Sequence, residues 1–186
     1  MAIASTSLNK AIRRAKETGT FALGGYQLGE LPRDLANIRE LREIKVINCG
    51  IETLPGWLAE LDIVSLDLAD NPLRGFPSVI LDLVNLRQLG MSAVGIGKLP
   101  DDIGTLACLQ TLTLLDCGLV SVPDSLAELT NLEELDLAFN NIGNFSHLTF
   151  PPNLTHLILS NNLLTRVPES MRGLAHSGFW SLITLA

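Results

Sequence analysis

Histidine and cysteine are the residue types of this chain best suited to metal binding or covalent catalysis. The histidines are His147, His156 and His176, and the cysteines are Cys49, Cys108 and Cys117. Neither set has the spacing of a zinc site, and no nucleophile is positioned to complete a catalytic set with His156 and a nearby carboxylate. Glycine-rich phosphate loops and the HExxH metal motif are also absent. We therefore expect no catalytic residue, no metal site and no cofactor, and a protein that is not an enzyme.

Charge is distributed unevenly along the 186 residues, whose net charge is −7. Residues 1–20 hold four basic residues and one acidic residue, so the rest of the chain carries −10. An acidic body repels a phosphate backbone. This argues against nucleic acid as a partner.

The N-terminus and the cysteine count bear on where the protein works. Residues 1–17 lack the apolar core of a signal peptide, and no stretch reaches the roughly 18 apolar residues needed to cross a bilayer. An odd number of cysteines without paired spacing favours reduced thiols. We expect a cytoplasmic location and no stable membrane anchoring.

The organisation of the chain is set by a repeat. A Leu-Pro dipeptide or its equivalent recurs at a step of 22 or 23 residues, at Leu31-Pro32, Leu54-Pro55, Phe76-Pro77, Leu99-Pro100 and Val122-Pro123, and again at Val167-Pro168. Around it stands the template LxxLxLxxNxLxxLPxxLxxL, of which we count seven copies. Periods of this length are typical of solenoids.

Each copy opens with two apolar residues that alternate with non-core residues, as a one-faced strand requires. These pairs are Phe21/Leu23, Ile44/Val46, Leu66/Leu68, Leu89/Met91, Leu112/Leu114, Leu135/Leu137 and Leu157/Leu159. One coil cannot bury its leucine interior alone, so the coils must stack. The predicted fold is an α/β solenoid with a curved parallel sheet on its concave side.

This template resembles the leucine-rich-repeat family over residues 18 to 186. The half-repeat Leu99-Pro100-Asp101-Asp102-Ile103-Gly104-Thr105-Leu106 looks like the intracellular class that includes Ras-suppressor and plant Ras-group proteins. The opening Ala15-Lys16-Glu17-Thr18-Gly19 is similar to small cytosolic members of the leucine-rich repeat-containing protein 57 type. The resemblance implies a non-catalytic protein-binding module, with a small GTPase or a phosphatase as a possible partner.

The asparagine position of the template supplies hydrogen bonds to neighbouring coils. Here it is occupied in turn by Tyr26, Cys49, Asn71, Val94, Cys117, Asn140 and Asn162. A thiol is a weak donor and valine has no polar atom. We expect the ladder to be best satisfied toward the C-terminal half and poorest at the fourth coil, and the cysteines in it to be buried and inert.

The two ends of the repeat array differ. Residues 1–20 form a predicted N-terminal capping helix, with Leu8, Ala11, Ile12 and Ala15 on one face, and residues 21–186 form the repeat domain. The basic residues of this helix could alternatively contact a membrane surface or an acidic partner. Residues 177–186 match part of an eighth repeat. This leaves two hypotheses, an array truncated from a longer one and an apolar edge that mediates self-association.

The solvent-facing positions of the predicted strands form the candidate binding surface. Carboxylates and unexpected apolar residues gather there, at Glu43, Ile47, Asp67, Asp70, Leu115, Asp116, Glu134, Asp136, Phe139 and Ile158. An apolar anchor with a charged rim is typical of a protein interface. We expect an adaptor or regulatory scaffold that binds a basic segment of a partner protein, although ordinary solvated side chains would give the same pattern. The alternative function is a structural or self-associating segment of a larger assembly.

Overall fold

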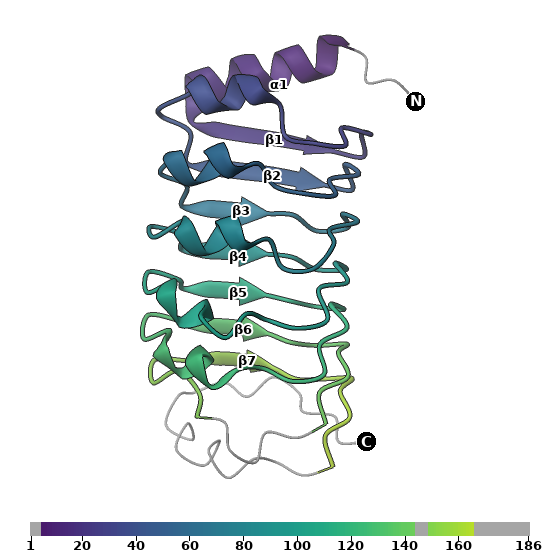
Figure 1. Cartoon of the computed structure of the whole chain (residues 1–186), viewed down its shortest axis with the longest axis vertical. Coiled ribbons are helices and arrows are strands. Elements are labelled where there is room, and N and C mark those ends of the chain that lie inside the picture. Colours follow the sequence, from purple (N-terminus) through teal and green to yellow (C-terminus); the bar gives the residue numbers. More distant parts are fainter. Residues whose placement is uncertain (1–4, 144–148, 166–186) are drawn as a thin grey trace.

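The computed structural model of the chain describes residues 5–143 and 149–165. Within them, seven strands form one parallel sheet in sequential order (Figure 1). The strands are β1 Thr20–Gly24, β2 Glu43–Ile47, β3 Ser65–Asp67, β4 Gln88–Gly90, β5 Thr111–Thr113, β6 Glu134–Asp136 and β7 His156–Ile158. Each strand pairs with the strand of the next coil, which is the arrangement that stacked repeats require.

The strand register confirms the repeat alignment. Phe21 pairs with Ile44, and Leu66 pairs with Leu89. The same row continues through the leucines of β5, β6 and β7. Both apolar residues of most pairs are buried in one continuous core. The predicted α/β solenoid with seven coils is therefore correct.

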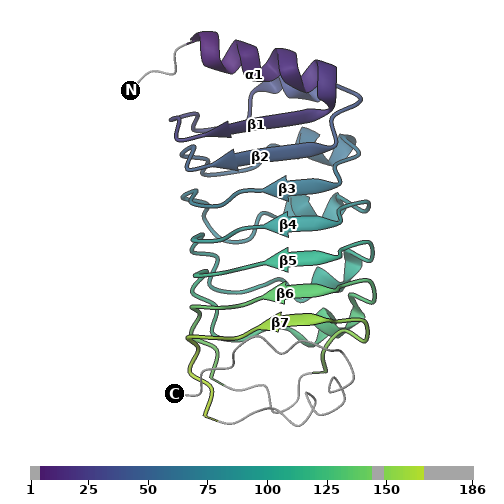
Figure 2. The ribbon, with the colours of Figure 1, turned by 180° about the vertical axis from the view of Figure 1, so that it is seen from behind.

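Short 3-10 helices lie on the side of the coils opposite the sheet, as the two views in Figures 1 and 2 show. They are η1 Arg33–Asn37, η2 Gly56–Glu60, η3 Ser78–Asp82, η4 Ile103–Thr105 and η5 Asp124–Glu128. In four of the five coils, the proline of the Leu-Pro motif directly precedes the helix with φ between −60° and −76°. Proline fixes φ near this value, which explains why these helices begin where they do.

The predicted N-terminal helix is α1, Ser5–Thr18, and it covers the open end of the first coil (Figure 1). Its apolar face is turned inward, with Ala11 and Ala15 buried. Gly19 ends the helix at φ +71°, where a Cβ would collide with the Glu40 carbonyl oxygen. No helix in the described ranges is long and apolar enough to cross a membrane.

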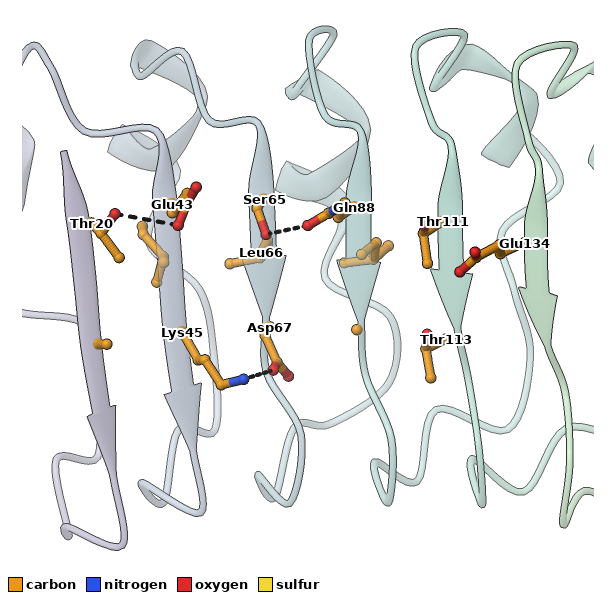
Figure 3. A pocket seen from close by; sticks show the side chains of 14 residues that line it. Thr20, Glu43, Lys45, Ser65, Leu66, Asp67, Gln88, Thr111, Thr113 and Glu134 are labelled. Carbon is orange, nitrogen blue, oxygen red and sulfur yellow. Dashed lines mark hydrogen bonds and ion pairs between the residues drawn. The ribbon is translucent and has the colours of Figure 1, made fainter. Parts of the chain in front are cut away.

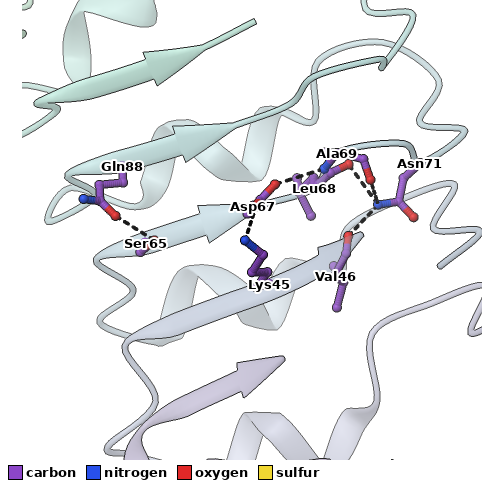
Figure 4. Close-up of polar contacts among 8 residues, drawn as sticks. All are labelled: Lys45, Val46, Ser65, Asp67, Leu68, Ala69, Asn71 and Gln88. Carbon is purple, nitrogen blue, oxygen red and sulfur yellow. Dashed lines mark hydrogen bonds and ion pairs between the residues drawn. The ribbon is translucent and has the colours of Figure 1, made fainter. Parts of the chain in front are cut away.

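Asparagine side chains connect neighbouring coils in the core. Asn71 Oδ1 accepts hydrogen bonds from the amides of Cys49 and Ile51, both at 3.0 Å. Its Nδ2 donates to three carbonyl oxygens of the second and third coils (Figure 4). Asn140 makes five equivalent bonds between the fifth and sixth coils. Asn71 therefore bonds its coils as fully as Asn140 does. Full bonding of the ladder is not confined to the C-terminal half, where the sequence predicts the best-satisfied junctions.

Cysteine takes the asparagine position in the second and fifth coils. Both side chains are buried, and the sulfur of Cys117 lies 3.0 Å from the Met91 carbonyl oxygen of the preceding coil. The sulfur of Cys49 lies 3.4 Å from the equivalent Leu23 oxygen. Burial raises the pKa of Cys117 to about 11 and also raises the pKa of Cys49. They are buried and protonated at neutral pH, as predicted.

Valine at the asparagine position leaves the gap that the sequence predicts at the fourth coil. Val94 is fully buried and has no polar side-chain atom. In the described part of the chain, the amides of Asn71 and Leu73, which occupy the positions served by asparagine elsewhere, have no acceptor. This is the weakest junction of the ladder.

Some predicted features fall outside the described residues. They are the partial eighth repeat and self-associating edge at 177–186, the Val167-Pro168 dipeptide, and two of the histidines, His147 and His176.

Candidate protein-binding surface

The exposed face of the sheet is built from the side chains that alternate with the core pairs. Residues of β1 to β6 line a shallow hollow of about 440 Å³ on this face (Figure 3). One row of this face consists of Lys45, Asp67, Gly90, Thr113 and Asp136, because the strands are in register. Any segment lying across the sheet would meet these residues in that order.

Polar side chains of β1 to β4 bond to one another across the strands. Thr20 Oγ1 donates to Glu43 at 3.2 Å. Lys45 Nζ lies 3.2 Å from Asp67 Oδ2, and Ser65 Oγ donates to the Gln88 side-chain oxygen (Figures 3 and 4). Asp67 also accepts the amide of Ala69. This half of the face therefore satisfies much of its own polarity.

The residues of β5 and β6 that line the hollow have no such cross-strand partner within residues 5–143 and 149–165. Figure 3 draws no interaction from Thr111, Thr113 or Glu134 to the other lining residues. Asp136 Oδ1 accepts the amide of Ala138 at 2.9 Å, the turn contact that Asp67 also makes, but no lysine or arginine pairs with it among the described residues.

The charge distribution explains this difference. Between Lys98 and Arg166 the sequence contains no lysine or arginine. The same stretch contains eight acidic residues, Asp101, Asp102, Asp116, Asp124, Glu128, Glu133, Glu134 and Asp136. All four ion pairs of the described chain accordingly involve cations at or before Lys98. Between Lys98 and Arg166 the coils have no lysine or arginine of their own to pair with their carboxylates.

The structure divides the ten predicted binding residues into two groups. Four lie on β2 and β3 or directly after them and form the N-terminal concave surface, Glu43, Ile47, Asp67 and Asp70. Six lie on β6 and β7 or directly after β5 and β6 and form the C-terminal concave surface, Leu115, Asp116, Glu134, Asp136, Phe139 and Ile158. Leu115 has the same template position as Ile47 and lies three coils later. Because neighbouring strands are spaced by about 4.8 Å, the two residues are roughly 14 Å apart. The ten residues do not form one contiguous patch.

The residue before each asparagine position adopts a left-handed backbone. Its φ lies between +51° and +58° at Asn48, Asp70, Ala93, Asp116, Phe139 and Asn161. Asn and Asp tolerate this conformation better than other residues with a side chain. Asp70 and Asp116 therefore have a backbone reason for their identity that is independent of binding.

Phe139 is the exception in this row. A bulky aromatic residue is disfavoured at positive φ by about 1 kcal/mol or more. Its side chain is nevertheless 55% exposed, so the core does not compensate for this cost. Leu115 and Ile158, in the coils before and after it, are half-buried. Folding alone does not explain an exposed phenylalanine here.

The histidine within the described residues is not part of a metal site. His156 Nδ1 lies 2.9 Å from Thr155 Oγ1, and His156 pairs in register with Glu134. No group of three or more His, Cys, Asp or Glu side chains in the described ranges could hold a metal ion.

The site residues that sequence reasoning missed are the partners of β1 to β4. Lys45, Ser65 and Gln88 are not among the ten predicted residues, yet each bonds to a side chain of the next or previous strand. The signal was available, because Lys45 and Asp67 occupy the same template position one coil apart. Oppositely charged residues at that spacing predict a cross-strand pair.

Two family models match the chain. The leucine-rich repeat region model matches residues 77–149, and the leucine rich repeat model matches residues 130–177. Among curated relatives, the volume-regulated anion channel subunit LRRC8B of Mus musculus is 29% identical over 162 residues, 78% of this chain and 19% of that protein. Adenylate cyclase of Schizosaccharomyces pombe is 30% identical over 142 residues, 75% of this chain and 8% of that enzyme. The chain thus spans less than a fifth of the length of these relatives.

Solved structures show the same architecture. The leucine-rich repeat domain of the type III effector XopL has a TM-score of 0.69 and 25% identity, covering 88% of this chain and 64% of that one. The Arabidopsis receptor kinase HAESA, solved with the peptide hormone IDA and the co-receptor SERK1, has a TM-score of 0.63 and 29% identity, covering 76% and 26%. Leucine-rich-repeat folds are generally non-catalytic protein-interaction scaffolds. The seven stacked coils and the two repeat matches together identify the chain as a member of the leucine-rich-repeat family.

Proposed function

We propose that the protein is a non-catalytic adaptor or regulatory scaffold that binds a basic segment of a partner protein through the C-terminal concave surface. The observation that carries this proposal is the stretch between Lys98 and Arg166, which has eight acidic residues and no lysine or arginine. Asp116, Glu134 and Asp136 lie on the exposed sheet face within it. A basic segment would supply the charges that the chain itself lacks.

Apolar side chains beside these carboxylates support binding rather than simple solvation. Leu115, Phe139 and Ile158 give an apolar centre, and the carboxylates give a polar rim. HAESA offers a precedent for the fold, because its structure holds a peptide hormone. The N-terminal concave surface is a poorer candidate, since a partner would have to break the Lys45–Asp67 and Thr20–Glu43 contacts first.

The partner class that we propose, a small GTPase or a phosphatase, rests on the resemblance to the intracellular repeat class. The surface adds that this partner should present a basic segment. A cytoplasmic location is part of the proposal, supported by three free cysteines.

The test uses two double variants that are matched in register and in charge. E134K with D136K reverses the C-terminal concave surface, and E43K with D67K makes the same changes at the same template positions in β2 and β3. Each pair shifts the net charge equally and removes one turn contact, to Ala138 or to Ala69. Partners captured from cell extract by the wild-type chain are compared by quantitative mass spectrometry. We expect the first variant to lose at least one partner that the second retains, whereas equal retention by both would contradict the proposal.

A further inference from the structure

Phe139 belongs to the C-terminal concave surface and is tied to the seventh coil through its backbone. Its amide donates to the Ser160 oxygen of the seventh coil at 2.9 Å. Ala138, the residue before it, accepts a hydrogen bond from the amide of Asp116 at 3.0 Å. The same Ala138 donates to Asp136 Oδ1. The carboxylate of Asp136 therefore bonds to the residue next to an exposed aromatic ring, and the backbone of Asp116, which has the template position of Phe139 one coil earlier, bonds to that residue too.

This combination suits one kind of side chain better than others. An aromatic face attracts a cation, and carboxylates beside the ring add charge-assisted hydrogen bonds. Arginine uses both, because its guanidinium is planar, weakly hydrated and able to stack on a ring while it donates in its plane. Lysine has a compact ammonium that stays strongly hydrated and gains less from the ring. The Oδ2 atom of Asp136 has no partner among the described residues and remains available to accept.

We propose that the C-terminal concave surface recognises an arginine side chain of its partner, with the guanidinium stacked on Phe139 and held by Asp116 and Asp136. This inference rests on the proposed function and specifies which side chain of the basic segment the surface recognises. It also accounts for the phenylalanine at φ +57°, where the equivalent positions of the other coils have Gly, Asn, Asp or Ala. Phe139 is thus the residue that determines specificity, while the carboxylates of the rim attract any basic segment.

The test separates charge from stacking with two probe peptides. Both are 12 residues long and identical except that one carries four arginines where the other carries four lysines. Each is titrated into the full ¹⁵N-labelled chain and followed by heteronuclear NMR shifts. We expect the wild-type chain to bind the arginine peptide about 3- to 10-fold more tightly, the range that a cation–π contact provides.

Three variants decide the outcome. F139N keeps a residue that favours positive φ, and it should bind the two peptides equally. F139Y retains an aromatic ring and should restore the preference for arginine. E134K with D136K should bind both peptides more weakly, by a similar factor. Equal binding of both peptides by the wild-type chain, or an arginine preference that survives in F139N, overturns the arginine inference but leaves the proposed function standing. If neither peptide shows salt-sensitive binding to the wild-type chain, the proposed function itself is contradicted.

Discussion

The two ends of the concave sheet face share one backbone register and differ in what their side chains contact. At the N-terminal end, Lys45 and Thr20 bond to carboxylates of the neighbouring coil. At the C-terminal end, Glu134 and Asp136 occupy the same template positions as Glu43 and Asp67 but have no cation beside them in the described chain. A solenoid can therefore place a surface whose polar side chains bond to one another and a surface with unpaired carboxylates on one continuous sheet.

The cores beneath these two surfaces are alike. Asn71 and Asn140 each make five hydrogen bonds, to equivalent atoms of adjacent coils. The difference between the two ends is thus confined to the exposed side chains. Variants that change the core should affect both ends similarly, and variants that change the surface should not.

The largest expected effect comes from removing an asparagine of the ladder. Asn140→Ala leaves the amides of Cys117 and Leu119 buried without an acceptor, and each such loss costs about 1–3 kcal/mol. We expect the free energy of unfolding to fall by about 3 kcal/mol or more in urea titrations. Asn71→Ala is the matched variant, and its free energy of unfolding should fall by a similar amount. A loss below about 1 kcal/mol in either variant would show that the ladder does not stabilise the stack.

A smaller effect is expected from alkaline pH through the buried thiols. The pKa of Cys117 is about 11 in the folded chain against the usual 9.0, so the folded state holds the thiol proton more tightly than the unfolded state. The stabilisation is complete below pH 9 and is lost as pH rises from 9 toward 11, by about 2 kcal/mol. Unfolding measured at pH 8.5 and at pH 11 should show this loss. The variant Cys117→Ala, which removes the thiol, should show a shallower decline, and an unchanged slope would contradict the assignment to Cys117.

Filling the gap at the fourth coil should stabilise the chain. Val94→Asn places a side-chain oxygen where the backbone amides of Asn71 and Leu73 lack an acceptor. We expect the free energy of unfolding to rise by about 1 kcal/mol, the usual net value of buried hydrogen bonds. The control Val94→Ala, which adds no polar atom, should destabilise. If the asparagine variant were no more stable than the alanine variant, the register of the ladder would be wrong at this coil.

The smallest expected change in stability is at Phe139, and its sign is informative. Phe139→Asn relieves an unfavourable backbone conformation and removes an exposed side chain, so the midpoint of urea unfolding should rise by the equivalent of about 1 kcal/mol. The matched change Asp116→Asn, in the same row, should be nearly neutral. A destabilised Phe139→Asn would mean that the ring supports the fold, and would remove the reason to regard it as a binding residue.

Much of this fold could be predicted because the repeat fixes it. The 22- or 23-residue step identifies the core pairs, and the apolar stripe of α1 predicts the cap. The 3-10 helices were not predicted, although the proline of the Leu-Pro motif directly precedes four of them. The resemblance to the intracellular class predicts a specific type of repeat. The family matches identify leucine-rich repeats in general and do not distinguish this type.

The candidate surface was harder to predict. A solvent-facing position gives the location of a carboxylate but not its partner, so Asp67 and Asp136 look alike in sequence and differ in the structure. A left-handed backbone at Asp70 and Asp116 is also invisible in a simple core pattern. A second ladder is invisible in the core pattern for the same reason. Asn131 and Asn153, which lie outside the asparagine position of the template, each donate to a carbonyl oxygen of the preceding coil.

The most direct test of a partner surface confined to one end of the sheet is to map which amides respond when a basic peptide binds. The arginine peptide is titrated into the ¹⁵N-labelled wild-type chain, and shift changes are assigned along β1 to β7. We predict changes concentrated on β5, β6 and β7 and on Phe139, which fade as salt is raised. Changes centred on β2 and β3 or on the side of η1 to η5 would contradict the account.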